Sequence, residues 1–230
     1  MVKDGIILIT WIARIIIAVR LFQVAARTVK SLYWLGGAFV INTVYYIFLL
    51  NLFNSISALK FWPITIGLTI AQLLIVLFIH HTFYSGQKSP YLIFFGITLA
   101  TGFTDMGLRI VNPDSFWFLI SVATSINWGW HAVIAYKAYH QVAEEDYVED
   151  WVKARYKLMI AYCACLATTG LGFFVRWFPH LSQIIQSLVG LFALAGVIIQ
   201  FLVWVMPENF RTYLNRNYHV ENIEDEVSLA

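Results

Sequence analysis

The charged side chains that could do chemistry in this chain are those deep in its long apolar segments, and Arg14 and Asp105 are the deepest of them. A charged group in an apolar bundle is costly, so it marks a candidate functional site. Arg109 follows Asp105 by four residues, the spacing of an ion pair on one helix, and we favour this local pair over a pair between Arg14 and Asp105. Arg14 then needs backbone carbonyls, Gln72 or a water-filled cavity as its partner.

Uncharged polar and aromatic residues in the middle of three apolar segments form a second candidate site. Amide and ring N–H groups at one depth could line a pocket for a small ligand, or a pore. Each amide could instead bond to a neighbouring helix, a contact worth about 0.6 kcal/mol on average in membrane proteins. The candidate lining residues are Asn42, Tyr45, Gln72, Asn127, Trp128 and Trp130.

Three histidines form a third candidate site, for haem or a metal. His80 and His81 lie near the end of one apolar segment, and His131 lies about two helical turns from the end of another. A histidine from each helix at similar depth could hold haem or relay protons. Alternatively, the terminal pair faces lipid headgroups and His131 forms a hydrogen bond inside the bundle. We expect no bound cofactor, with haem as the alternative.

The sequence lacks several catalytic motifs. It has no glycine-rich phosphate loop, no Cys-x-x-Cys pair and no His-Glu-x-x-His motif. The last apolar segment has no lysine for a retinal Schiff base. Cys163 and Cys165 are separated by one residue, so we interpret them as packing residues and not as a disulfide. An enzyme is therefore not the expected function.

The composition indicates which elements position these residues. The 230 residues are 60% hydrophobic, 17% aromatic and only 12% charged, with a mean hydropathy of +0.72. A soluble domain carries about 25% charged residues, so this chain cannot cover a water-facing surface. The net charge of +2 is too small to indicate a nucleic-acid partner. The class that fits is an all-α integral membrane protein that crosses the cell membrane several times.

Stretches without charge divide the chain into membrane spans, which need about 20 apolar residues each. All five prolines fall at predicted helix ends or in connections, where proline is tolerated. The first segment holds Arg14 and Arg20; if it lies on the membrane surface, six spans remain. We predict a seven-helix bundle over 1–206, with spans at 5–27, 31–54, 61–84, 90–109, 115–137, 157–177 and 181–206.

Lysine and arginine predict the orientation, because they concentrate in connections on the inner side of a membrane. With seven spans, the side that holds the C-terminus carries Arg27, Lys30, Lys88, Lys137, Lys153, Arg155, Lys157, Arg211 and Arg216. The other side carries Lys3, Lys60, Arg109 and Arg176. The imbalance predicts an outside N-terminus and an inside C-terminus.

Three segments outside the spans lie on the predicted inner side. Residues 138–156 place apolar residues on one stripe, with acidic residues first and basic residues last. This pattern is typical of a surface helix or of an extension of the preceding span, and it is a candidate docking face for a cytosolic protein. We predict that residues 207–218 form an interfacial amphipathic helix and that residues 219–230 form a disordered acidic tail.

Three functions are compatible with the sequence. The first is a sensor or receptor that binds a small ligand in the bundle and signals through 138–156 and the tail. The second is a small-solute transporter or channel that uses the level of Asn42, Gln72 and Asn127. The third is a haem-binding membrane subunit of an electron-transfer complex. All three functions have the lipid bilayer as a partner, and all three are compatible with an oligomer. We favour the sensor or receptor, because charged residues and amphipathic stripes concentrate on the predicted inner side.

Overall fold

The computed structural model describes residues 2–51, 61–84, 88–111, 118–145, 147–172 and 182–215. Within these ranges the chain forms eight helices and no strand, which confirms the all-helical prediction. The helices are α1 (Val2–Arg27), α2 (Leu32–Asn51), α3 (Phe61–Phe83), α4 (Tyr91–Val111), α5 (Phe118–Ala143), α6 (Asp150–Gly172), α7 (Ser182–Val205) and α8 (Glu208–Leu214).

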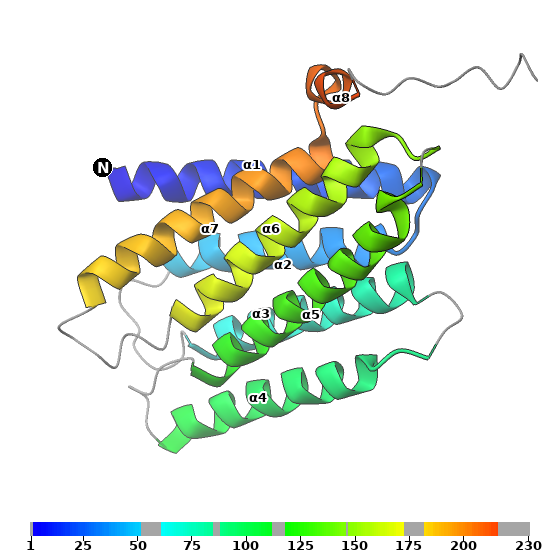
Figure 1. The fold of residues 1–230 in the computed structure, drawn as a ribbon. Coiled ribbons are helices and arrows are strands. Elements are labelled where there is room, and N and C mark those ends of the chain that lie inside the picture. Colours follow the sequence, from blue (N-terminus) through cyan, green and yellow to red (C-terminus); the bar gives the residue numbers. More distant parts are fainter. Residues whose placement is uncertain are drawn as a thin grey trace, which may run out of the picture.

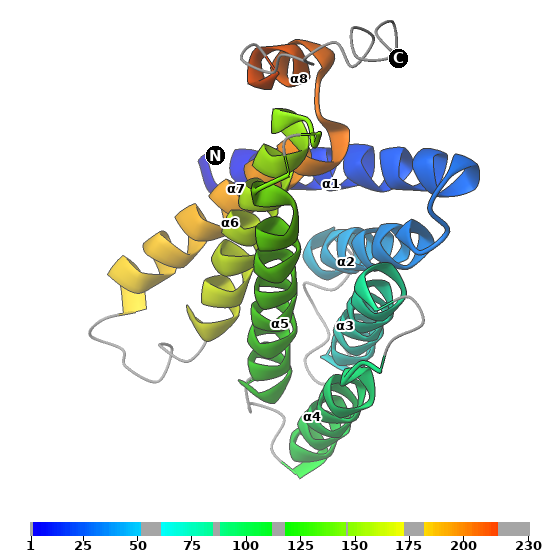
Figure 2. The same ribbon diagram turned by 45° about the vertical axis from the view of Figure 1, so that its right-hand side comes forward.

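The seven long helices form a bundle in which successive helices run in opposite directions (Figure 1). Contacts join them in chain order from α1 to α7, and α1 also contacts α7, so the helices close into a ring. α3 contacts α5 directly, which places α4 on the outside, against both of them (Figure 2). Six helices, α1, α2, α3, α5, α6 and α7, therefore surround the middle of the bundle.

The chain turns at the two ends of the bundle alternately. α1, α3, α5 and α7 finish at the end where α8 lies, which we call the α8 end (Figure 1). α8 lies across this end and contacts α6. We call the opposite end, where α1 begins, the α1 end. In the predicted seven-span topology, the connections at these two ends would lie on opposite sides of a membrane.

Three helices in the described part of the chain are long and apolar enough to cross a membrane. The qualifying stretches are Thr65–Phe83 of α3, Tyr91–Leu108 of α4 and Ser187–Val205 of α7. α4 turns large apolar side chains outward, and Leu92 and Phe103 are 67% and 65% exposed. Apolar surface of this kind is typical of a helix that faces lipid. These features indicate that the protein associates with a membrane.

Small residues let the helices approach closely where they cross. A methyl group added to Gly170 of α6 would meet the Ser121 carbonyl oxygen of α5 at 2.9 Å, and also the Ser125 hydroxyl. A methyl group added to Gly102 of α4 would meet the Thr69 side chain of α3. Small interface residues are the usual packing device of membrane helices, because lipid leaves no hydrophobic effect between helices.

The observed helices differ most from the predicted spans around 138–156. The first part of this segment extends α5 to Ala143, and its last part, from Asp150, forms the first turns of α6. The segment is therefore not a separate surface helix, because its two ends belong to α5 and α6, which contact each other. α8 lies within the predicted interfacial helix at 207–218, and the predicted tail at 219–230 lies outside the described residues.

Candidate functional site

A cavity of about 100 Å³ lies in the middle of the bundle. The six helices that surround the middle all line it, and its polar wall consists of Arg14, Asn42, Gln72, Ser121, Thr124, Thr169 and Gln200. Its apolar wall includes Phe39, Leu68, Ile120, Trp128 and Leu166. One water needs only about 10–15 Å³ of such space, whereas drug-sized ligands occupy about 300 Å³ or more. The cavity therefore has room for a molecule of a few heavy atoms.

Four of the residues that the sequence singles out meet at this cavity. Arg14 of α1, Asn42 of α2, Gln72 of α3 and Trp128 of α5 all line it. Closure of the ring brings the first and last long helices together, and each contributes one lining residue, Arg14 from α1 and Gln200 from α7. The side chain of Tyr45 lies outside the described part of the structure.

Gln200 of α7 is the lining residue with the clearest need for a partner. The residue is 1% exposed, and neither its amide oxygen nor its amide nitrogen has a hydrogen-bond partner among the described residues. A buried donor or acceptor left unpaired costs about 1–3 kcal/mol. A polar group inside the cavity would recover this free energy, so Gln200 makes the cavity a candidate binding site.

Asn127 of α5 supports the cavity wall from behind. Its amide nitrogen donates to Gln72 Oε1 at 3.3 Å and to Thr98 Oγ1 at 3.0 Å, and the residue is fully buried. These bonds join α5 to α3 and α4. They are the hydrogen bonds between neighbouring helices that the sequence offered as the alternative to a pocket-lining role. Asn127 therefore positions the lining amide of Gln72 and does not itself line the cavity.

Asp105 of α4 caps the first turn of α5. Its carboxylate accepts long hydrogen bonds from the backbone N–H groups of Leu119 and Ile120, both at 3.4 Å, and the residue is 2% exposed. A carboxylate in this position satisfies free N–H groups and complements the helix dipole. Ile120 lines the cavity, so Asp105 fixes the start of the cavity wall on α5. The Arg109 side chain lies outside the described part, so its pair with Asp105 stays a prediction.

The two predicted tryptophans of α5 lie on different faces of the helix. Trp128 belongs to the cavity wall, whereas Trp130 stacks on Phe94 of α4 with ring centroids 4.1 Å apart and planes at 4°. Trp130 also lies beside Tyr84, with ring centroids 6.2 Å apart. Trp128 and Trp130 are two positions apart in the sequence, and such residues are separated by about 200° around the helix axis, so they face different neighbours. Trp130 is not one of the lining residues.

His80 and His81 make their contacts at the α8 end of α3. The Nδ1 atom of His80 lies 2.9 Å from Ser89 Oγ, and its ring stacks on Tyr91 with centroids 4.1 Å apart. The His81 ring stacks on Trp34 with centroids 6.1 Å apart. These contacts join α3 to the starts of α4 and α2. Both histidines therefore have packing partners outside the cavity.

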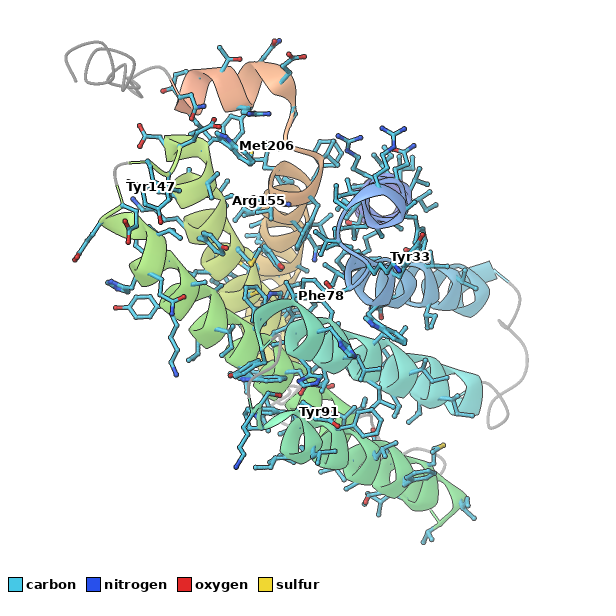
Figure 3. All side chains as sticks on the ribbon, turned by 90° about the vertical axis from the view of Figure 1, so that its right-hand side faces the viewer. Tyr33, Phe78, Tyr91, Tyr147, Arg155 and Met206 are labelled. Carbon is cyan, nitrogen blue, oxygen red and sulfur yellow. The ribbon has the colours of Figure 1, made fainter. Side chains whose placement is uncertain are left out.

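His131 lies deep in the bundle, next to the cavity wall. It is fully buried, and neither ring nitrogen has a hydrogen-bond partner within the described ranges, so the internal hydrogen bond considered from the sequence is not seen. Four aromatic rings surround it at centroid distances of 5.5–5.9 Å, those of Phe78, Phe83, Trp128 and Tyr162. Phe78 is labelled in Figure 3. No group of three metal-ligating side chains occurs among the described residues, and haem binding stays a prediction.

A polar cluster at the α8 end, formed by Glu149, Trp151, Arg211 and Asn215, fastens α8 to the start of α6. Glu149 Oε2 accepts hydrogen bonds from the Trp151 indole and the Asn215 amide, both at 2.6 Å, and lies 3.6 Å from Arg211 Nη2. Asn215 Oδ1 accepts from the Trp151 backbone N–H at 3.0 Å, and the Arg211 guanidinium lies 4.6 Å from the Trp151 ring centre. Hydrogen bonds from Asn215 and Trp151, together with the Arg211 charge, lower the pKa of Glu149.

Sequence reasoning missed Gln200, although a signal for it exists. It is the only amide within the apolar stretch Ser187–Val205, and an isolated polar residue in such a stretch faces the bundle interior by default. Ser121 and Thr124 were also missed, because small hydroxyl residues bond to their own helix and carry little directional information. The Thr124 hydroxyl does so, donating to the Ile120 carbonyl at 2.9 Å.

The described cavity wall offers hydrogen-bonding groups and one positive charge. Its lining residues include no Asp, Glu, His, Lys or Cys, the usual groups of acid–base and nucleophilic catalysis. The hydrogen-bonding groups that are present can hold a polar molecule. Comparison with protein-family models, with curated proteins and with solved structures finds no match for this chain.

Proposed function

We propose that this chain is a multi-pass protein of the cell membrane that acts as a sensor or receptor, with a small ligand bound in the central cavity. The observation that carries the proposal is the buried Gln200 amide, which lines the cavity without a partner among the described residues. In this proposal all seven long helices cross the membrane, with the N-terminus outside and the C-terminus inside.

The environment of α1 supports its role as a span. α1 contacts both α2 and α7 in the ring. It is apolar on its buried face, where Ile17 and Leu21 are 0% and 1% exposed, and also on its outward face, where Ile12 and Ile16 are 49% and 44% exposed. A helix on a membrane surface has one apolar face and one polar face. From Ile12 to Val19 the outward face of α1 is apolar, which favours insertion; the exposed Arg20 and Arg27 lie in its last two turns, from which they can reach the membrane surface.

The connection between the cavity and the α8 end supports a signalling role. α6 lines the cavity with Leu166 and Thr169 and begins beside Glu149, while α7 lines it with Gln200. α7 then leads into α8 through Met206, which is labelled in Figure 3 and has a φ of 39°. Non-glycine residues rarely adopt this left-handed conformation, and it costs about 1–3 kcal/mol. If α7 exchanges between two placements in the bundle, a ligand that binds one of them more tightly shifts the equilibrium toward it. The strained joint at Met206 and α8 would then move together with α7.

A thermal-shift screen tests the proposal. The purified protein in lipid nanodiscs would be heated with small amino acids, carboxylic acids, amides and polyols, each at millimolar concentration. We expect at least one solute to raise the Tm, because a ligand at 100 times its Kd stabilises the folded state by about 2.7 kcal/mol. Gln200→Leu should abolish this shift, whereas Gln141→Leu, at an exposed position outside the cavity, should retain it.

The proposal fails if no solute raises the Tm, or if the shift is the same in Gln200→Leu. Liposomes that accumulate the stabilising solute only when they contain the protein would favour the transporter. A Soret band in the purified protein would favour the haem-binding subunit.

A further inference from the structure

A surface cleft of about 330 Å³ lies where α1 finishes, at the α8 end of the bundle (Figure 1). Arg20, Gln23, Val24 and Arg27 of α1 line it, together with Thr28, which follows the helix. All of these residues except the half-buried Val24 are exposed, so the cleft opens to the outside of the ring of helices. Its described lining holds two guanidinium groups and no carboxylate.

The outward face of α1 is apolar before it reaches the cleft. Ile12, Ile16 and Val19 are between 44% and 50% exposed. Gln23 and Arg27 continue their spacing of three or four residues, so all five side chains belong to one face of the helix. Along this face, alkyl groups give way to basic and amide groups toward the α8 end. A phospholipid has the same order of chemistry, with acyl chains followed by a phosphate headgroup.

The two arginines of the cleft select for a phosphate group. The planar fork of a guanidinium donates two parallel N–H bonds to phosphate oxygens. Arg20 and Arg27 are seven residues apart, which places them about 10 Å apart along the helix axis and on the same side of it. A headgroup that enters the cleft therefore lies between two positive charges, beside the amide N–H donors of Gln23.

The lack of an acidic residue in the described lining indicates the class of lipid. The headgroup of phosphatidylcholine would bring its own cation beside two arginines, with no lining carboxylate to pair with that cation. The headgroup of phosphatidylglycerol brings a phosphate and no cation. Anionic lipids also concentrate in the cytoplasmic leaflet, and the cleft lies on the predicted inner side.

We propose that the cleft binds the headgroup phosphate of an anionic phospholipid, whose acyl chains lie along the apolar outward face of α1. The inference goes beyond the proposed function, because it names a second ligand at a second site. It rests on the placement of α1 across the membrane in that proposed function, and it is independent of the ligand in the central cavity.

Native mass spectrometry of the full-length protein in detergent tests the inference. Phosphatidylglycerol and phosphatidylcholine with identical acyl chains are titrated, and the Kd of the first bound lipid is compared. We expect phosphatidylglycerol to bind about 25-fold more tightly, since each basic residue near an anionic lipid contributes a factor of about five. This comparison needs only the parent protein, so it holds even if a variant fails to fold.

Paired substitutions locate the site. Arg20→Gln combined with Arg27→Gln should make the two lipids bind equally. Lys88→Gln combined with Lys137→Gln is the matched control, because it removes two exposed charges from the same end of the bundle but outside the cleft. The control should keep the preference for phosphatidylglycerol. Equilibrium dialysis with isotope-labelled inorganic phosphate provides a further arm, in which we expect weaker binding than that of the lipid, because free phosphate has no acyl chains.

Several results would overturn the inference. Equal Kd values for the two lipids in the parent would do so, as would a preference that survives in the arginine variant or is lost equally in the lysine control. Inorganic phosphate that binds as tightly as phosphatidylglycerol would assign the cleft to free phosphate. If the lipid preference is absent while a tag at Met1 is accessible from outside the cell, the lipid site is wrong and the proposed topology stands. A protected Met1 tag would remove the placement of α1 and the lipid site together.

Discussion

Asp105, Asn127 and Gln200 are each no more than 2% exposed, yet the bundle uses them in different ways. Asp105 caps the neighbouring helix, and Asn127 bonds across to Gln72 and Thr98. The Gln200 amide has no such bond in the described ranges. Buried polar groups in proteins nearly always find a partner. Among the described residues Asn127 lacks one only for its amide oxygen, whereas Gln200 lacks one for both amide atoms and lines the cavity, so Gln200 is the candidate binding residue.

Replacing Asp105 tests the structural role. Asp105→Ala should lower the free energy of unfolding by about 1 kcal/mol, because it removes a helix cap and its favourable charge. The effect is measured by unfolding the protein with SDS in mixed micelles. Thr104→Ala is the control, since in the described part of the structure the exposed Thr104 hydroxyl donates within its own helix, to the Ala100 carbonyl. Equal losses in the two variants would show that the cap contributes nothing.

At the scale of the helices, the cavity depends on how closely α5 and α6 approach. Gly170 lines the cavity and lies against Ser121 and Ser125 of α5. The Ser125 hydroxyl also donates to the Ala167 carbonyl of α6 at 2.9 Å. A side chain at Gly170 would separate these helices and widen one seam of the cavity.

Gly170→Ala should therefore destabilise the bundle, by about 1–3 kcal/mol as for overpacking in a dense core. Gly129→Ala is the matched control, because a methyl group there meets no atom of the described residues within 4 Å. The control should be neutral or stabilising, by about 0.5–1 kcal/mol, since alanine favours a helix over glycine. SDS unfolding of both variants gives the comparison, and a Gly170→Ala protein as stable as the parent would contradict the close approach.

The attachment of α8 should depend on pH through Glu149. Its pKa is lowered in the folded protein, so its contribution to docking is present above the ordinary value of 4.5 and is lost as the pH falls through the lowered pKa. The distance between nitroxide labels on Gln141→Cys and Thr212→Cys, measured by pulsed EPR in a Cys165→Ser background, should stay constant from pH 7 to 5 and lengthen in stronger acid.

Glu149→Gln should lengthen or broaden this distance already at pH 7, because the amide replaces a charged acceptor shared by Trp151, Arg211 and Asn215. The exposed Glu144→Gln should behave as the parent does. A distance that is independent of both pH and the Glu149 substitution would show that other contacts hold α8.

At the scale of the whole molecule, the sequence was sufficient to predict the helices but not their rotation. Long apolar runs without charge predict helix positions because few other structures satisfy the backbone in lipid. Helices that are apolar on all sides carry little periodicity, so the inward face is not readable. Depth alone grouped Asn42, Gln72 and Trp128, which line the cavity, with Asn127 and with Trp130, which stacks on α4, and these two are not lining residues. Arg14 of α1 and Gln200 of α7 line the same cavity because the first and last long helices contact each other, which no local pattern reveals.

The central claim is that all seven long helices cross the membrane around one polar cavity. Only α3, α4 and α7 meet the criteria of length and hydropathy among the described residues. If these three alone crossed, the connection between α5 and α6 would lie on the side opposite to α8. If all seven cross, this connection and α8 lie on the same side.

The most direct measurement is labelling of single cysteines in intact cells with a maleimide that cannot cross the membrane. Lys88→Cys, Glu144→Cys and Asn209→Cys replace exposed residues at the α8 end. We predict that all three react only after the cells are permeabilised, while an epitope tag at Met1 is accessible from outside. A Glu144→Cys protein that reacts in intact cells while Asn209→Cys does not would contradict the seven-helix membrane bundle, and a Met1 tag protected together with all three positions would remove α1 from it.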